Sequence, residues 1–176
     1  MNYEMPLYRP PSEAYSLIFQ VTIGCSHNRC AFCTMYKNKK FRVRPWDDLK
    51  TDILEMALLN RATRRIFLAD GDALVVDTDY MVKILNFLYD KFPYLERVSA
   101  YANPGNLLEK SAEELKTIRE SGLQMLYFGI ETGDDDLLVK VRKGATSQDL
   151  IASAGKAIDA GFILSATVIL GLAGKK

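Results

Sequence analysis

Three cysteines within nine positions, in the pattern Cys25-x4-Cys30-x2-Cys33, are the residues whose types and spacing most clearly suggest chemistry. Thiolates are strong ligands for iron and zinc, so three on one short segment can hold a metal ion or an iron–sulfur cluster from one side. Three ligands leave one iron of a four-iron cluster without a protein ligand, much as a catalytic zinc keeps one position open. The pattern therefore predicts a cluster with an iron available for chemistry.

Two other interpretations of the cysteines stay open. They could be ordinary thiols, although an odd number of cysteines in so short a run argues against a disulfide framework. They could also bind zinc together with His27, the only histidine in the sequence. Structural zinc sites usually arrange their ligands as two separated pairs, and this run has no second pair.

The elements that must position this motif alternate along the chain. Short apolar segments that read as buried strands are interleaved with segments of helical spacing. Strands that are apolar throughout are typical of a parallel sheet covered on both faces. The predicted strands are 16–23, 65–69, 97–101, 124–130 and 162–170, and the predicted helices are 46–60, 78–92, 134–142 and 148–160. A further helix begins at a capping box of Ser111 and Glu114 and stops near Gly122.

This pattern predicts an α/β fold, an incomplete parallel (β/α) barrel of about five βα units, as a single domain over residues 1–176. The last strand, 162–170, is followed by no helix that would cover it. An uncovered apolar strand suggests that the chain is truncated at its C-terminal end or that another chain covers it.

Polar residues and glycines follow the predicted strands at the end where parallel α/β folds bind ligands. The cysteines follow the first strand, and the later strands are followed by Asp70-Gly71-Asp72, Asn103, Glu131-Thr132-Gly133 and Gly171. Each of these has a plain structural alternative. Asp-Gly pairs are common in turns, and Glu131 could be a solvated loop acid or could cap the next helix. Together they outline one site.

The cysteine motif, with the aromatic Phe32 just before its last cysteine, resembles the signature of radical S-adenosylmethionine (SAM) enzymes. The surrounding QVTIGCSHNRCAFCTMYK is similar to uncharacterised bacterial members related to the Elongator-type and B12-binding-domain-type Fe–S oxidoreductases. The commonest spacing in this superfamily has three residues between the first two cysteines. Here there are four, which also occurs in some members.

The resemblance implies a partial TIM barrel with a [4Fe–4S] cluster on Cys25, Cys30 and Cys33. It implies that SAM is reductively cleaved to methionine and a 5′-deoxyadenosyl radical, which abstracts hydrogen from a substrate that the sequence does not identify. That substrate could be a small molecule or RNA. An electron donor such as flavodoxin or ferredoxin would reduce the cluster.

The resemblance also assigns SAM contacts to particular positions. Gly71 and Asp72 would bind the amino group, although the corresponding motif usually ends in Glu, and Asn103 belongs to the same strand-end set. Glu131 would bind the ribose hydroxyls. Lys143, or its neighbour Arg142, would bind the carboxylate; both could instead be a solvated helix end. Phe32 would pack on the adenine, and the backbone from Val168 to Gly171 would contact it, although Phe32 could be loop packing and the 168–171 segment core strand.

Charge and hydropathy exclude several partners. The formal net charge is +1, so binding by charge alone is not expected. The basic run 37–44 reads as a solvated face, with guidance of a nucleic acid as the alternative. Residues 1–13 lack the pattern of a signal peptide, and the longest apolar stretch, 162–173, is shorter than the roughly 20 residues that span a bilayer. We expect a cytoplasmic protein that does not bind membranes.

Three functional alternatives remain at this point. The chain could be a cluster-carrying module without catalysis, a zinc-binding structural domain, or an inactive fragment of a longer enzyme. The cluster module predicts iron–sulfur spectra without SAM cleavage, and the zinc domain predicts colourless protein that contains zinc. In a fragment, the SAM site could be largely present while the substrate site is missing.

Overall fold

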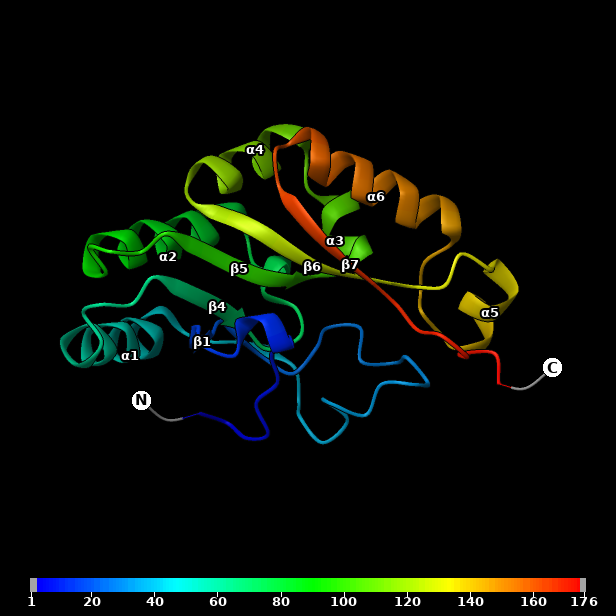
Figure 1. The fold of residues 1–176 in the computed structure, drawn as a ribbon, viewed down its shortest axis with the longest axis horizontal. Coiled ribbons are helices and arrows are strands. Elements are labelled where there is room, and N and C mark those ends of the chain that lie inside the picture. Colours follow the sequence, from blue (N-terminus) through cyan, green and yellow to red (C-terminus); the bar gives the residue numbers. More distant parts are fainter. Residues whose placement is uncertain (1–2, 175–176) are drawn as a thin grey trace.

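The computed structural model describes residues 3–174, which form a five-stranded parallel sheet with helices (Figure 1). The strand order is β1-β4-β5-β6-β7, so each strand lies beside the strand of this sheet that follows it in the chain. The sheet is open rather than closed into a barrel. Its strands are β1 (Leu17–Gln20), β4 (Arg65–Ala69), β5 (Arg97–Ala102), β6 (Leu123–Glu131) and β7 (Ile163–Val168).

Helices follow these strands and pack against the sheet. The longer ones are α1 (Trp46–Leu59), α2 (Thr78–Lys91), α4 (Ala112–Glu120) and α6 (Ser147–Asp159). Figure 1 shows α2, α4 and α6 along one side of the sheet. Shorter turns of helix are η1 (Pro11–Glu13), η2 (Ala73–Val75), α3 (Pro104–Glu109) and α5 (Asp135–Lys140). In the part of the chain that the structure describes, none of the helices combines the length and apolar character of a membrane span.

The first predicted strand, 16–23, is divided in the structure. After β1 the hydrogen bonds change partner, because the Arg44 N–H donates to the Val21 carbonyl and the chain turns out of the sheet. Residues Thr22–Ile23 form β2, which pairs antiparallel with β3 (Arg42–Val43). A continuous apolar run does not reveal such a change of partner, so the sequence predicted one strand where there are two.

Other differences from prediction are local. The capping box of Ser111 and Glu114 at α4 is confirmed, and a second one, Thr146 with Asp149, begins α6. Helix α3 was not predicted. Asn103 is its N-cap, whose side chain accepts a hydrogen bond from the Gly105 N–H, and Pro104 is its first residue. The last predicted strand, 162–170, ends at Val168 in the structure.

The strands alternate between two environments. Leu68 and Leu126 are fully buried in the large apolar core that the helices cover, with Leu49, Leu85 and Ile118. Their chain neighbours Phe67 and Tyr127 point to the opposite side of the sheet, since successive side chains of a strand alternate. There they pack against Tyr3 and Leu7 of the N-terminal segment, residues 3–16.

A buried carboxylate fixes this N-terminal segment. Glu13 is fully buried, and its Oε1 accepts hydrogen bonds from Arg97 Nη2 at 2.7 Å, Ser99 Oγ at 2.9 Å and Tyr127 OH at 2.6 Å. The other oxygen bonds Ser16. A buried charge is tolerated when it is paired and its remaining acceptors are satisfied, as here.

Candidate cluster and cofactor site

The cysteines lie on the loop that follows β2, which we define as the cysteine loop, residues 24–39. Its first residue, Gly24, has a φ of +77°, which favours glycine. The Asn28 side chain donates to the Tyr36 carbonyl at 2.8 Å, and the Ala31 N–H donates to the Val141 carbonyl at 2.8 Å. The loop is thus bonded both within itself and to the segment after α5.

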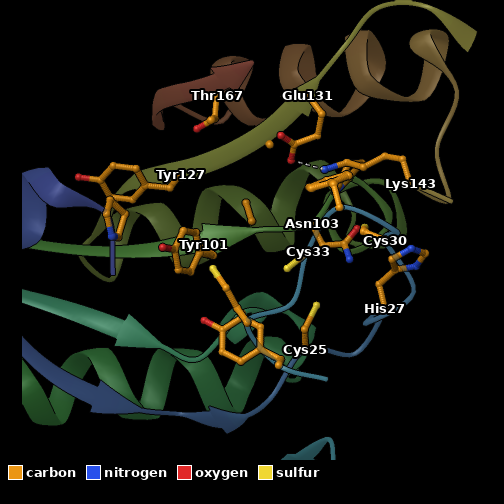
Figure 2. Close-up of a pocket in the computed structure, with 18 of the residues that line it drawn as sticks. Cys25, His27, Cys30, Cys33, Tyr101, Asn103, Tyr127, Glu131, Lys143 and Thr167 are labelled. Carbon is orange, nitrogen blue, oxygen red and sulfur yellow. Dashed lines mark hydrogen bonds and ion pairs between the residues drawn. The ribbon is translucent and has the colours of Figure 1, made fainter. Parts of the chain in front are cut away.

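A cavity of about 400 Å³ lies between this loop and the carboxyl ends of the strands. Figure 2 shows the three cysteines on one side of it, with Glu131 and Lys143 across from Cys25 and Cys33. All three thiols are free and partly exposed. The predicted residues that line the cavity are Cys25, Cys30, Phe32, Cys33, Gly71, Asn103, Glu131 and Lys143.

An ion pair forms part of the cavity wall. Lys143 Nζ lies 3.0 Å from Glu131 Oε1, and both side chains are about nine-tenths buried. Glu131 has a φ of +65° at an irregularity in the pairing of β6 with β7. A Cβ atom at position 129 would overlap the Glu131 carboxylate, so Gly129 is what allows this carboxylate to fold back toward Lys143.

Three predicted SAM contacts, Asp72, Val168 and Gly171, are not part of this lining. Asp72 is fully buried and bonds Ser26 Oγ and Asn106 Nδ2, and burial raises its pKa to about 6. Val168 is 59% exposed at the end of β7, where Thr167 reaches the cavity instead. Contact of these three residues with SAM stays a prediction.

Gly71 does reach the cavity, and its lack of a side chain has a structural reason. A Cβ atom at this position would lie 2.5 Å from Tyr36 Cε2 and 3.0 Å from Cys25 Cβ. Any other residue would therefore push on the cysteine loop. The absence of a side chain at Gly71 thus leaves room for Tyr36 and Cys25, and contact of Gly71 with SAM stays a prediction.

Other residues of the cavity were missed by the sequence analysis. The N-terminal segment contributes Arg9, Pro10 and Pro11, and the strands contribute Tyr101 and Tyr127. The tyrosines carry a signal that could have found them, because each interrupts a run of small or apolar residues at a position facing away from the helices. Nothing in residues 9–11 marks them as part of a site.

The donors fit a cluster bound from one side. Burial raises the pKa of the Cys25 and Cys30 thiols, while the Lys143 ammonium lowers that of Cys30, so binding of iron would displace protons. The only imidazole, His27, bonds the Arg142 carbonyl through Nε2 at 2.8 Å. Within residues 3–174, no three His, Cys, Asp or Glu side chains converge as the ligands of one metal ion would. A cluster spreads its thiolate ligands over several irons, and thus requires no such convergence.

The family model described as the Radical SAM superfamily matches residues 19–176. The chain belongs to the radical SAM superfamily. A [4Fe–4S] cluster and SAM are the cofactors that this membership supports.

Known relatives extend well beyond the length of this chain. It is 28% identical over 160 residues to the heme chaperone HemW of Bacillus subtilis (strain 168), covering 86% of this chain and 41% of that protein. The structure is similar to that of the cobalamin-dependent radical enzyme OxsB with aqua-cobalamin and SAM bound, with a TM-score of 0.65, 18% identity, and coverage of 88% and 24% of the two chains. It is also similar to the methyltransferase TsrM of Kitasatospora setae with cobalamin and a [4Fe–4S] cluster bound, with a TM-score of 0.63, 16% identity, and coverage of 87% and 30%. The two structures, at these identities, show that the fold is shared.

Proposed function

We propose that this protein is a radical SAM enzyme whose cluster is held by Cys25, Cys30 and Cys33. The observation that carries the proposal is that the three thiols and the Glu131–Lys143 pair line one cavity at the carboxyl ends of the strands. When bound, the cluster and SAM supply reductive cleavage of SAM to methionine and a 5′-deoxyadenosyl radical that abstracts hydrogen from the substrate. The protein itself would bind the cluster, orient SAM and the substrate, and shield the reaction from water.

Glu131 and Lys143 are suited to a ligand that carries both charges and hydroxyl groups. In the structure each satisfies the other at 3.0 Å. A SAM molecule could exchange this bond for two others, from a ribose hydroxyl to Glu131 and from Lys143 to the SAM carboxylate. Phe32 would pack on the adenine, and Asn103 and Gly71 would complete the wall nearest the cysteines. Val168, Gly171 and Asp72 remain candidates from the resemblance alone.

The remaining part of the cavity is open for a substrate. Tyr101 and Tyr127 line it away from the Glu131–Lys143 pair (Figure 2), and Arg9 and Pro10 also belong to the lining. We propose no particular substrate, and both a small molecule and RNA stay open. A donor such as flavodoxin or ferredoxin would reduce the cluster. The chain spans less than half of HemW, so the whole reaction, with its substrate and electron donor, is a proposal.

A cluster protein without catalysis is the second candidate. The observation that favours it is the similarity to HemW, which is named a chaperone rather than an enzyme. Both candidates bind a cluster, but only the enzyme cleaves SAM reductively.

The test is anaerobic reconstitution with iron and sulfide, followed by reduction, addition of SAM and assay of 5′-deoxyadenosine. We expect an iron–sulfur absorption spectrum and 5′-deoxyadenosine from the unaltered protein. Cys30→Ala should lose both, because two thiolates hold a cluster poorly. A reduced, intact cluster with no 5′-deoxyadenosine would exclude the enzyme and favour the second candidate. Zinc without iron in protein purified anaerobically would exclude both.

A variant of the ion pair tests the SAM contact separately. Glu131→Gln should keep the cluster and weaken SAM binding about tenfold, since a hydrogen bond to a charged group is worth roughly 1.5–3 kcal/mol and the amide still accepts. Equilibrium binding of SAM to reconstituted protein measures this. Glu120→Gln, at the exposed end of α4, is the matched control and should bind SAM normally. Equal affinities of the two variants would contradict the role of Glu131.

A further inference from the structure

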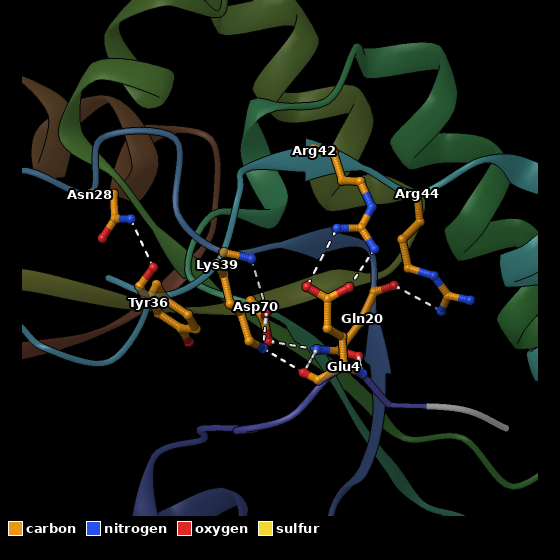
Figure 3. A network of polar contacts seen from close by, with 9 residues as sticks. Glu4, Gln20, Asn28, Tyr36, Lys39, Arg42, Arg44 and Asp70 are labelled. Carbon is orange, nitrogen blue, oxygen red and sulfur yellow. Dashed lines mark hydrogen bonds and ion pairs between the residues drawn. The ribbon is translucent and has the colours of Figure 1, made fainter.

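Asp70, two residues before Asp72, has no place in the function proposed so far. It is fully buried and does not line the cavity. Its carboxylate nevertheless accepts hydrogen bonds from three segments of the chain (Figure 3). A buried carboxylate whose oxygens already accept hydrogen bonds and which does not line the cavity can influence the site only through the residues that it holds.

Two of those bonds join the two ends of the cysteine loop. The N–H of Gly24, at the start of the loop, donates to Asp70 Oδ2 at 2.9 Å. Lys39 Nζ, at the end of the loop, lies 2.8 Å from the same oxygen. A Cβ atom on Gly24 would lie 3.3 Å from Lys39 Cβ, so the two ends are in contact. The loop is thus closed at its base on one carboxylate oxygen.

The other bonds hold the carboxylate itself in place. Gln20 Nε2, from the end of β1, donates to Asp70 Oδ1 at 3.0 Å. Gln20 and Lys39 both also donate to the carbonyl of Glu4, at 3.0 Å and 2.6 Å. The side chains of Lys39 and Asp70 are 3% and 0% exposed, so water cannot replace these bonds.

We infer that the buried Lys39–Asp70 ion pair is a positioning device that closes the base of the cysteine loop and holds its thiols toward the cavity for the cluster. The inference rests on the proposed function, because it assumes that the loop binds a cluster. Gly24 immediately precedes Cys25, so the bond that fixes Gly24 also fixes the backbone from which the first thiol projects. Groups that orient metal ligands commonly affect metal affinity about 10–100-fold when they are lost.

The chain contains a matched ion pair outside the loop. Arg44 Nη1 lies 2.8 Å from Asp52 Oδ2, the same distance, with side chains only 14% and 10% exposed. This pair joins Arg44, just after β3, to α1. Arg44 Nη1 also donates to the Gln20 carbonyl at 3.3 Å, and within residues 3–174 neither side chain hydrogen-bonds a residue of the cysteine loop. Removing either acid leaves a largely buried cation without its partner, so both changes lower stability. Only the change at Asp70 should also loosen the cluster.

The experiment compares Asp70→Asn with Asp52→Asn, each reconstituted anaerobically with iron and sulfide in the absence of SAM. The measurement is the rate at which the iron–sulfur absorbance is lost to an iron chelator, well below both unfolding temperatures. We expect the cluster of Asp70→Asn to be lost about tenfold faster than that of Asp52→Asn and of the unaltered protein. Equal rates in the two variants would overturn the inference.

A milder variant keeps the test decisive if Asp70→Asn does not fold. Lys39→Gln retains a donor to Asp70 but removes the charge, and it should lose its cluster faster than Asp52→Asn by a smaller factor. A rate equal to that of Asp52→Asn would overturn the inference. The readout needs no SAM, so an unaltered protein that holds its cluster but makes no 5′-deoxyadenosine would exclude the proposed enzyme and leave this inference standing.

Discussion

The two sides of the parallel sheet are built from adjacent residues of the same strands, yet they are filled in different ways. On the helix side, Leu68 and Leu126 pack among fully buried aliphatic and aromatic side chains. On the cavity side, Phe67, Tyr101 and Tyr127 meet edge to face, beside buried charges such as Glu13. The alternation of strand side chains sends one residue to each side in turn.

The helix side of the sheet mainly stabilises the fold, whereas the cavity side mainly positions polar groups. Close apolar packing on the helix side contributes free energy of folding in proportion to the area buried. On the cavity side, polar groups are held by specific partners, and these partners fix the N-terminal segment and the cysteine loop around a space. Substitutions on the two sides should therefore have different consequences, even between neighbours in the chain.

The largest effect is expected on the helix side. Leu126→Ala should lower the free energy of unfolding by about 2–5 kcal/mol, because it removes a fully buried side chain and leaves a cavity. Urea unfolding of the apoprotein measures this. Leu59→Ala, at a side chain 73% exposed, is the control and should change stability by less than about 0.5 kcal/mol. Similar losses in both would mean that burial does not distinguish the two sites.

An intermediate effect, dependent on pH, is expected at Asp72. Burial raises its pKa from 3.8 to about 6, so the folded state binds this proton more tightly than the unfolded state. The protonated carboxyl of Asp72 therefore stabilises the folded state fully below about pH 4, and this stabilisation is lost as the pH rises through about 6. The free energy of unfolding of Asp72→Asn, relative to that of the unaltered protein, should therefore rise by up to about 3 kcal/mol between pH 4 and pH 7. Thermal unfolding across this range measures the difference, and a gap that does not change with pH would contradict the shift.

The smallest effect is expected at Tyr127, on the cavity side beside Leu126. Tyr127→Phe removes one of the three donors to Glu13 Oε1 and should cost about 1.5 kcal/mol in unfolding free energy. Tyr94→Phe, at a side chain 63% exposed, should cost nothing measurable. Because the hydroxyl serves Glu13 rather than the cysteines, the cluster content of Tyr127→Phe should be normal. Loss of iron in this variant would show that the two polar networks are linked.

Much of the fold follows from patterns of neighbouring residues. The five sheet strands were predicted near their observed positions, as was the capping box of Ser111 and Glu114, because periodicity and capping are local. The division of the first strand and the helix α3 were not, because each depends on where the chain finds its next hydrogen-bond partner. Of the site residues predicted from the sequence, eight line one cavity in the structure. Asp72, Val168 and Gly171 lie outside its lining.

The sequence by itself determined the cysteine spacing, the alternation of strands with helices, and the polar residues that follow the strands, since all three are patterns of residues close together in the chain. Only the tertiary structure decided that Glu4, Gln20, Lys39 and Asp70 meet at the base of the cysteine loop. It also decided that Ser99 donates to Glu13 and that Arg9 lines the cavity. Hydrogen bonds between distant segments require atoms about 3 Å apart, and that precision comes from how all the elements pack together.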